Sequence, residues 1–154
     1  MEIPLLRGVV LAVTLLAVPA MGEEAPSFGQ WIELRSYRNF KCLEILSSLA
    51  HNGAHAGVWG CHGGANQKWS LVGEEIRSDM HNKCLEILDS GQHNGAHVGL
   101  WDCHGGANQK WYWDGNFIRS RLNNKCLEIL SSINADGAHV GVWDCHGGSN
   151  QRWY

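Results

Sequence analysis

The sequence predicts an all-β fold built from three repeats, and three observations lead to this expectation. The segment CHGGANQKW at 61–69 recurs unchanged at 103–111, and a close copy, CHGGSNQRW, stands at 145–153. The copies keep a constant step of 42 residues, which bounds the architecture to a short array of equivalent units. Glycine, of which the chain has 19, is scattered through the repeats. Since each glycine costs about 1 kcal/mol in a helix interior, a helical fold is disfavoured.

Each repeat contains two segments with the alternation of β-strands. The segment KCLEIL, at 41–46, places Leu43 and Ile45 on one side of a strand and its Cys and Glu on the other. The segment HVGLWDC, at 97–103, alternates in the same way. A turn-rich stretch, DSGQHNG at 89–95, precedes that second strand. This order of elements predicts two antiparallel strands joined by turns in every repeat.

The cysteines suggest a register for these two strands. If Cys84 and Cys103 face each other across the pair, Glu86 faces Trp101 on the side away from the apolar residues. Each repeat then carries a carboxylate beside an indole on the non-core side of the sheet, which is unusual for residues that only pack. The equivalent pairs are Glu44 with Trp59 and Glu128 with Trp143.

Three hairpin-rich units related by pseudo-threefold symmetry predict a β-trefoil, in which a six-stranded barrel is closed beneath by three hairpins. A single repeat cannot bury its apolar face alone, so the three must close on one another. We expect repeats of about 42 residues at 31–73, 74–115 and 116–154. The Trp that ends each repeated segment is expected in the core beneath the barrel; these are Trp69, Trp111 and Trp153.

The N-terminus has the pattern of a secretory signal peptide. Arg7 precedes an apolar run at 9–18, and Ala20-Met21-Gly22 suits cleavage. We therefore expect a signal peptide at 1–22 and a short linker at 23–30. The apolar run is about ten residues long, whereas a membrane span needs about 20. Export agrees with the six cysteines, which are expected in disulfides, so the protein is predicted to be secreted without membrane insertion.

The charge pattern gives no sign of a nucleic-acid partner. The formal net charge is −3, and the basic residues are scattered without a run. Nucleic acids and anionic membrane surfaces both require clustered positive charge. The sequence does not indicate an oligomeric state.

The repeats resemble the ricin B-chain type lectin repeat, which also occurs in trefoil xylan-binding modules. The resemblance rests on NKCLEIL, NGAHVGLWDCHGGANQKW and IRS, and on the Gln-x-Trp signature, present as QKW, QKW and QRW. It implies one disulfide within each repeat: Cys42–Cys61, Cys84–Cys103 and Cys126–Cys145.

The resemblance also implies a shallow sugar pocket on each repeat. In the family, an acidic residue accepts hydrogen bonds from sugar hydroxyls and an aromatic ring stacks on the sugar. The Asn before the signature Gln adds a hydrogen bond, and that Gln braces the acid. The matching residues here are Glu44, Trp59, Asn66 and Gln67 in the first repeat, Glu86, Trp101, Asn108 and Gln109 in the second, and Glu128, Trp143, Asn150 and Gln151 in the third.

Two departures from the family, and one difference between the repeats, leave the sugar open. The acid is Glu in all copies, where the family usually has Asp. Galactose binders often carry Gln where this chain has Gly57, Gly99 and Gly141. The first repeat has Gly60 in place of the Asp of the other two, so its binding strength is expected to differ. The expected partners are glycans, either galactose- or GalNAc-type or xylan-type sugars.

Two sets of histidines also recur with the repeat: His55, His97 and His139, and His62, His104 and His146. Imidazoles suit zinc or copper, but a spacing of seven residues between the sets matches no compact helix-borne metal motif. We expect polar loop residues or donors to a sugar, with no metal and no cofactor.

Catalysis is not expected, because the cysteines are used in bridges and the repeated Glu residues lie on separate lobes, whereas glycoside hydrolysis needs a carboxylate pair about 5–10 Å apart. The sequence therefore predicts a secreted, non-catalytic lectin with up to three equivalent sites. The alternatives are a structural or inhibitory trefoil that acts through protein contacts, and a His-based metal-binding protein.

Overall fold

Short strands and single 3-10 turns make up the computed structural model, which describes residues 30–154. The strands in this part of the chain are β1 (Cys42–Ile45), β2 (Ala56–Trp59), β3 (Trp69–Val72), β4 (Glu75–Ser78), β5 (Cys84–Ile87), β6 (Ala96–Trp101), β7 (Trp111–Asp114), β8 (Phe117–Ser120), β9 (Cys126–Ile129) and β10 (Ala138–Trp143). The 3-10 turns are η1 (Leu46–Ser48), η2 (Ala65–Gln67), η3 (Leu88–Ser90), η4 (Ala107–Gln109), η5 (Leu130–Ser132) and η6 (Ser149–Gln151).

The predicted signal peptide, 1–22, and the predicted linker, 23–30, lie outside the described residues except for Gln30. Among the residues that are described, no helix has the length and apolar character needed to cross a membrane.

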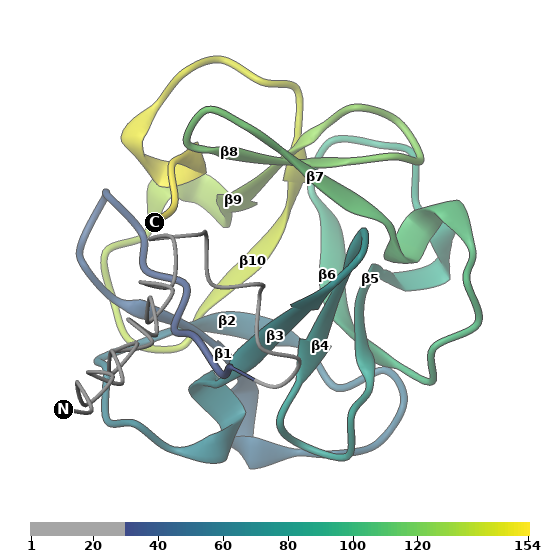
Figure 1. Cartoon of the computed structure of the whole chain (residues 1–154). Helices are drawn as coiled ribbons and strands as arrows, with labels where there is room; N and C mark the ends of the chain where they lie inside the picture. Colours follow the sequence, from purple (N-terminus) through teal and green to yellow (C-terminus); the bar gives the residue numbers. More distant parts are fainter. Residues whose placement is uncertain (1–29) are drawn as a thin grey trace, which may run out of the picture.

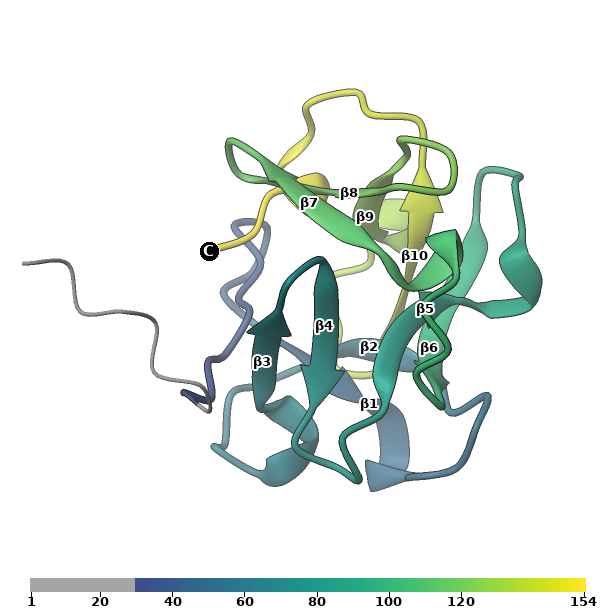
Figure 2. The same ribbon diagram turned by 45° about the vertical axis from the view of Figure 1, so that its right-hand side comes forward.

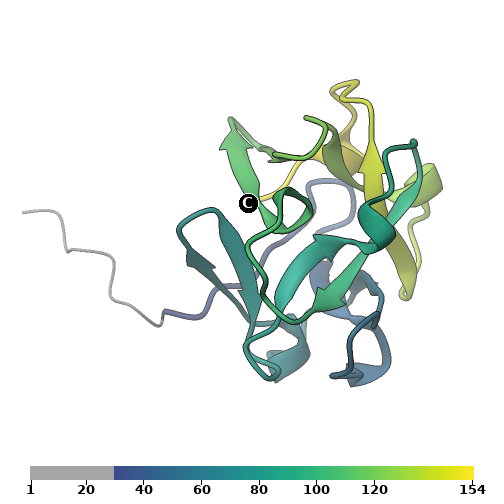
Figure 3. The same cartoon turned by 90° about the vertical axis from the view of Figure 1, so that its right-hand side faces the viewer.

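The strands form three lobes around the middle of the molecule, where β2, β6 and β10 meet (Figure 1). All pairings between strands are antiparallel. The hairpins β3–β4 and β7–β8 lie on the same side of the molecule as the C-terminus (Figures 2 and 3). This arrangement confirms the predicted β-trefoil.

The two ends of the described chain supply the third hairpin. Ser36 pairs with Trp153 in an antiparallel bridge. The N–H of Arg35 donates to the Tyr154 carbonyl at 2.8 Å, and the N–H of Tyr154 donates back to the Arg35 carbonyl at 3.0 Å. The N-terminal and C-terminal segments therefore close the threefold ring through backbone hydrogen bonds.

The three signature tryptophans lie in the core, as predicted. Trp69 and Trp153 are fully buried and Trp111 is nearly so. Buried indoles require a partner for their N–H group. Here each Nε1 donates, at 2.9–3.0 Å, to a carbonyl in the strand of its own repeat that carries the first Cys, the acceptors being Leu43, Leu85 and Leu127.

The disulfides have the predicted pairing, Cys42–Cys61, Cys84–Cys103 and Cys126–Cys145. The predicted register was wrong by two residues. In the second repeat Cys84 pairs with Trp101, and Glu86 pairs with Gly99. Cys103 lies beyond the end of β6 and returns to Cys84 from the following loop, so the disulfide does not join directly opposed strand positions. Because side chains alternate with period two, a shift of two leaves the same residues on each face.

Three glycines allow β2, β6 and β10 to meet closely. A Cβ atom at Gly57, Gly99 or Gly141 would stand 2.3–2.7 Å from a backbone carbonyl oxygen of a neighbouring repeat. That distance is shorter than any normal contact, so a side chain here would push the central strands apart. The sequence presented these glycines only as a departure from galactose binders, and the structure supplies a packing reason for them.

Candidate functional site

The carboxylate of each repeat is buried and held by the signature Gln. In the second repeat, Glu86 Oε2 accepts a hydrogen bond from Gln109 Nε2 at 2.8 Å. The same Nε2 donates to the Asp102 carbonyl at 2.9 Å, and Gln109 Oε1 accepts the His104 N–H at 2.8 Å. Gln109 is fully buried, so its amide fixes the carboxylate to the loop that follows β6.

The first and third repeats reproduce this arrangement. Gln67 Nε2 donates to Glu44 Oε2 at 2.9 Å, and Gln151 Nε2 donates to Glu128 Oε2 at 2.8 Å. In the first repeat Asn66 Nδ2 also donates to Glu44 Oε2, at 3.2 Å. The three sites are therefore copies of one structure, with one additional hydrogen bond in the first.

A histidine that follows the second Cys completes each site. His104 Nε2 lies 3.2 Å from Glu86 Oε2. Its other ring nitrogen, Nδ1, accepts the Gly106 N–H at 3.1 Å, so it carries no proton. The neutral ring must then hold its proton on Nε2, directed at the carboxylate. His62 and His146 have the same place, with Nε2–Oε2 distances of 3.4 and 3.2 Å.

The Gly-Gly pair explains how this ring reaches the carboxylate. Gly105 has a φ of +76°, which few other residues adopt. A Cβ atom at Gly106 would lie 2.6 Å from the His104 ring. Both glycines are needed for the ring to fold back. Sequence reasoning noticed these histidines but did not include them in the site; their threefold recurrence beside the second Cys was the available signal.

The aromatic residues form exposed platforms at the ends of β2, β6 and β10. Trp59, Trp101 and Trp143 expose 44%, 40% and 40% of their surface. A loop from another repeat approaches one edge of each ring. Cβ atoms placed at Gly137, Gly53 and Gly95 would lie 3.6–3.9 Å from Trp59, Trp101 and Trp143, respectively. Each indole is thus supported by a neighbouring repeat while its surface stays open to solvent.

An open hollow of about 220 Å³ joins these groups in the first repeat. Drug-sized ligands occupy pockets of about 300–1,000 Å³, so this hollow suits a smaller molecule such as one sugar ring. Two serines in left-handed backbone conformation form its rim. The lining residues are Glu44, Ser47, Ser48, Trp59, His62 and Asn66.

The structure brings the predicted residues of each repeat together. Glu44, Asn66 and Trp59 line one hollow, and Gln67 lies fully buried with its amide on the carboxylate. Asn66 is nearly buried and also donates to the Ile45 carbonyl at 3.2 Å. The equivalent Asn108 and Asn150 donate to Ile87 and Ile129 in the same way. The Gln side chains face the interior, so their position is that of a brace beneath the site.

Salt-bridged clasps between repeats lie next to the sites. Lys83 Nζ bonds to the Asp102 carboxylate and, at 2.8 Å, to Asn52 Oδ1 from the first repeat. The hydrogen bond from Lys83, followed by that from Asn52, lowers the pKa of Asp102 below its ordinary 3.8. Lys125, Asp144 and Asn94 repeat this clasp between the second and third repeats.

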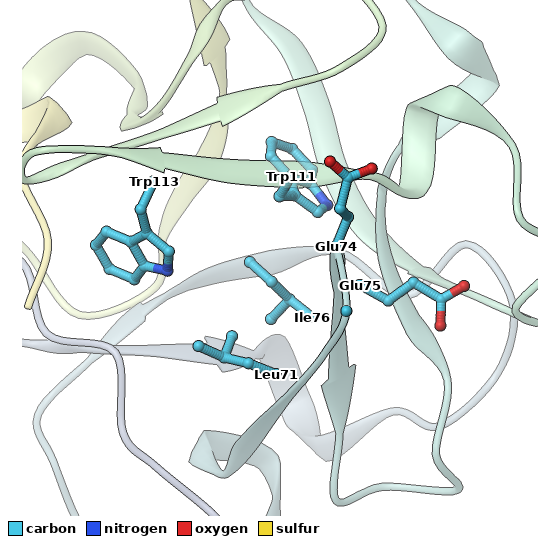
Figure 4. Close-up of a pocket in the computed structure, with 7 residues that line it drawn as sticks. Leu71, Glu74, Glu75, Ile76, Trp111 and Trp113 are labelled. Carbon is cyan, nitrogen blue, oxygen red and sulfur yellow. The ribbon is translucent and has the colours of Figure 1, made fainter. Parts of the chain in front are cut away.

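A second, smaller hollow lies between the β3–β4 hairpin and β7 (Figure 4). Trp111 and Trp113 lie on the β7 side, with Leu71 and Ile76 on the other. Its volume is about 30 Å³, against about 220 Å³ for the hollow beside Glu44 and Trp59, so it is too small for a sugar ring.

A closed threefold β-trefoil with one copy of the same surface site on each repeat defines the class of this protein. The family model described as "Ricin-type beta-trefoil lectin domain" matches residues 30–153. The chain belongs to the ricin-type β-trefoil lectin family.

Solved structures of similar fold agree with this assignment. A designed threefold-symmetric protein, ThreeFoil, is 25% identical with a TM-score of 0.74, covering 80% of this chain and 95% of its own. The C-half of the earthworm R-type lectin, in complex with GalNAc, is 24% identical with a TM-score of 0.70, covering 82% and 97%. The β-trefoil lectin of the Vibrio vulnificus hemolysin/cytolysin, with N-acetyl-D-lactosamine bound, is 26% identical with a TM-score of 0.66, covering 80% and 91%. A comparison with curated protein sequences finds no significant match.

Proposed function

We propose that this protein is a non-catalytic lectin that binds glycans through three equivalent shallow sites, one on each repeat. The observation that carries the proposal is the threefold recurrence of a buried, braced Glu beside an exposed Trp. In the second repeat these are Glu86, held by Gln109, and Trp101. A structural role alone requires neither a buried carboxylate nor an exposed indole.

The geometry suits sugar hydroxyls. Among described residues, every hydrogen bond to the Glu86 carboxylate ends on Oε2, which leaves Oε1 for a hydroxyl donor. Hydrogen bonds to an ionised acceptor are about twice as strong as neutral ones. The Trp101 face offers an apolar surface for the C–H groups of a pyranose ring, as aromatic side chains do. His104, about half exposed, lies at the edge of the carboxylate and holds its Oε2 through Nε2.

The sugar class follows from the same site. The N-acetyl-D-lactosamine complex of the Vibrio vulnificus relative supports a short saccharide ligand. Glu extends its carboxylate one methylene further than Asp, and the central glycines remove the Gln of galactose binders. We propose galactose- or GalNAc-type or xylan-type sugars, with specificity set by the distance between Glu86 and Trp101.

Export completes the proposal. The predicted signal peptide at 1–22 and the three disulfides support an extracellular protein. The three repeated carboxylates belong to separate lobes and each is tied to its own Gln, an arrangement that supports binding without glycoside hydrolysis.

A glycan array followed by calorimetry tests the proposal. Each site should bind one sugar at about 0.1–10 mM, or about 3–5 kcal/mol. Three sites on one rigid body should raise binding to a glycan-coated surface by about 100-fold or more. Trp101→Ala should lower the stoichiometry for free sugar by about a third and weaken surface binding more steeply.

The matched control is Trp113→Ala, which removes an equally exposed Trp from outside the three sites. A triple variant of Trp59, Trp101 and Trp143 should stay folded and lose glycan binding. If it kept full binding to the glycan surface, or if free sugar never competed, the protein-contact function would replace this proposal.

A further inference from the structure

The other recurring histidines form a partly exposed cluster where the central strands of the three repeats meet. The ring centroids of His55, His97 and His139 lie 4.9, 5.0 and 5.2 Å apart in the three pairs. The rings are packed edge to face. Each histidine comes from a different repeat, so the spacing within one repeat could not reveal that the three meet.

The central strands position these rings. His139 pairs with Gly57, His97 with Gly141, and His55 with Gly99. Each ring thus stands opposite a glycine of another repeat, at the close approach described above. The three glycines that admit no side chain are the same residues that let the three imidazoles converge.

The donor atoms are close enough for a single ion. One nitrogen from each ring lies within 4.8 Å of the other two. Zinc binds imidazole nitrogen at about 2.0–2.1 Å, so three tetrahedral donors stand about 3.3 Å apart. To reach that separation, each ring nitrogen would have to move toward the common centre by up to about an ångström.

Two of the ring nitrogens have no partner within residues 30–154. The Nδ1 atoms of His55 and His97 are buried and make no hydrogen bond there. A buried polar atom left without a partner destabilises the fold. Both atoms belong to the cluster in which the three repeats meet. A metal ion bound by all three rings would accept electron pairs from such nitrogens and remove the cost.

We propose that His55, His97 and His139 bind one divalent transition-metal ion, with Zn²⁺ as the reference ion, on the pseudo-threefold axis. Imidazole nitrogen is a preferred donor for zinc, copper and nickel. Three protein ligands leave a fourth coordination position to solvent. None of its ligands lines the hollow described in the first repeat, and the site ties one residue of every repeat to a single point.

The test uses the full chain without a polyhistidine tag, stripped with EDTA and dialysed. Calorimetric titration with Zn²⁺ should give one ion per chain, and the melting temperature should rise with Zn²⁺ concentration, as for any ligand of the native state. His139→Gln should weaken Zn²⁺ binding by at least about tenfold and remove the shift. His81→Asn, which removes a histidine from a separate loop, should leave both unchanged.

Three outcomes would overturn the proposal. One is the absence of heat and of any melting shift at about 1 mM Zn²⁺. Another is a stoichiometry of three that His104→Ala lowers to two, which would place the metal at the Glu–His pairs of the sugar sites. The third is unchanged Zn²⁺ binding in His139→Gln and in His97→Gln. Sugar binding by the EDTA-treated protein is measured in parallel and should persist, so a failure here leaves the lectin proposal standing.

Discussion

The junction that closes the ring differs from the two junctions inside it. Between the first and second repeats, and between the second and third, a Lys pairs with an Asp of its own repeat and the preceding repeat adds a neutral Asn. These sets are Lys83, Asp102 and Asn52, and Lys125, Asp144 and Asn94.

At the closing junction the carboxylate has changed sides. Gly60 stands where the Asp would be, and Asp136 of the third repeat stands where the Asn would be. Lys41 Nζ donates to Asp136 Oδ1 at 2.6 Å, and the Gly60 N–H donates to the same oxygen at 2.9 Å. The Lys keeps its partner, but the ion pair now crosses from one repeat to another.

The difference teaches that Gly60 and Asp136 belong together: the carboxylate absent at position 60 is present at position 136. From the sequence alone, Gly60 indicated only that the first site differs in binding strength. The structure shows that the carboxylate absent at position 60 is supplied by Asp136, 76 residues later. This contact lies at the boundary between the third and first repeats, which no peptide segment joins directly. A charged link is therefore found where the chain itself provides none.

The largest test compares the disulfides. Replacing both cysteines of one bridge by Ala should lower the free energy of unfolding by about 3 kcal/mol in the chain-entropy model, because each bridge closes a loop of the same length. Denaturant unfolding of the three double variants measures this. Equal losses are expected; a much larger loss for Cys42–Cys61 would show that the closing junction depends on its bridge.

The next effect concerns the braces. Gln109→Ala should destabilise the protein by about 1–3 kcal/mol, because the buried Glu86 carboxylate loses its buried donor and keeps only the half-exposed His104. Gln67→Ala should cost less, since Asn66 also donates to Glu44 in the first repeat. Denaturant midpoints of both variants test the order, and equal losses would contradict it. The control is Lys68→Ala, at the neighbouring half-buried position, which should change the midpoint little.

A smaller effect is expected from exchanging the clasp. Asp136→Asn should lower the denaturant midpoint slightly, because Lys41 loses its carboxylate at an exposed site. Adding Gly60→Asp should restore the midpoint, because the closing junction then has the same residues as the other two. Gly60 has room, since its Cβ would lie 3.9 Å from Asp136 Oδ1. If the double variant were less stable than Asp136→Asn alone, the two positions would not be exchanging one role.

The smallest effect is in the acid range. The pKa of Asp136 is lowered by Lys41 and by the Gly60 N–H, and that of Asp144 by Lys125 and Asn94. A depressed pKa contributes stability that is present above the ordinary 3.8 and is lost as the pH falls through the folded value. Carboxyl NMR titration should find all three clasp carboxylates below 3.8, and Lys125→Gln should return Asp144 alone toward it.

The sequence was sufficient for the features that repeat along the chain. The step of 42 residues predicted the trefoil and the burial of Trp69, Trp111 and Trp153, and the resemblance to the ricin B-chain repeat implied the three bridges. The predicted strand register was wrong because Cys103 lies past the end of β6. The two bonded cysteines therefore do not occupy facing positions of the strand pair. The sugar site residues assembled as a group, although their binding role stays a prediction.

What the sequence could not provide were contacts between repeats. His55, His97 and His139 follow one another at steps of 42 residues, and Gly60 and Asp136 are 76 residues apart. No local pattern measures such separations, since they depend on how the ring closes. The same is true of Gly57, Gly99 and Gly141, whose need for a bare Cα comes from carbonyl groups of other repeats.

The support of each Trp platform by another repeat has a consequence for how such a protein can be divided. Gly53 of the first repeat lies against Trp101 of the second, Gly95 against Trp143, and Gly137 against Trp59. A peptide of one repeat would therefore hold a Glu, a Gln and a Trp but not a finished platform. If these surfaces bind sugar as proposed, three such peptides would have to assemble in a ring to rebuild them, so binding by a single repeat would depend on its trimerisation.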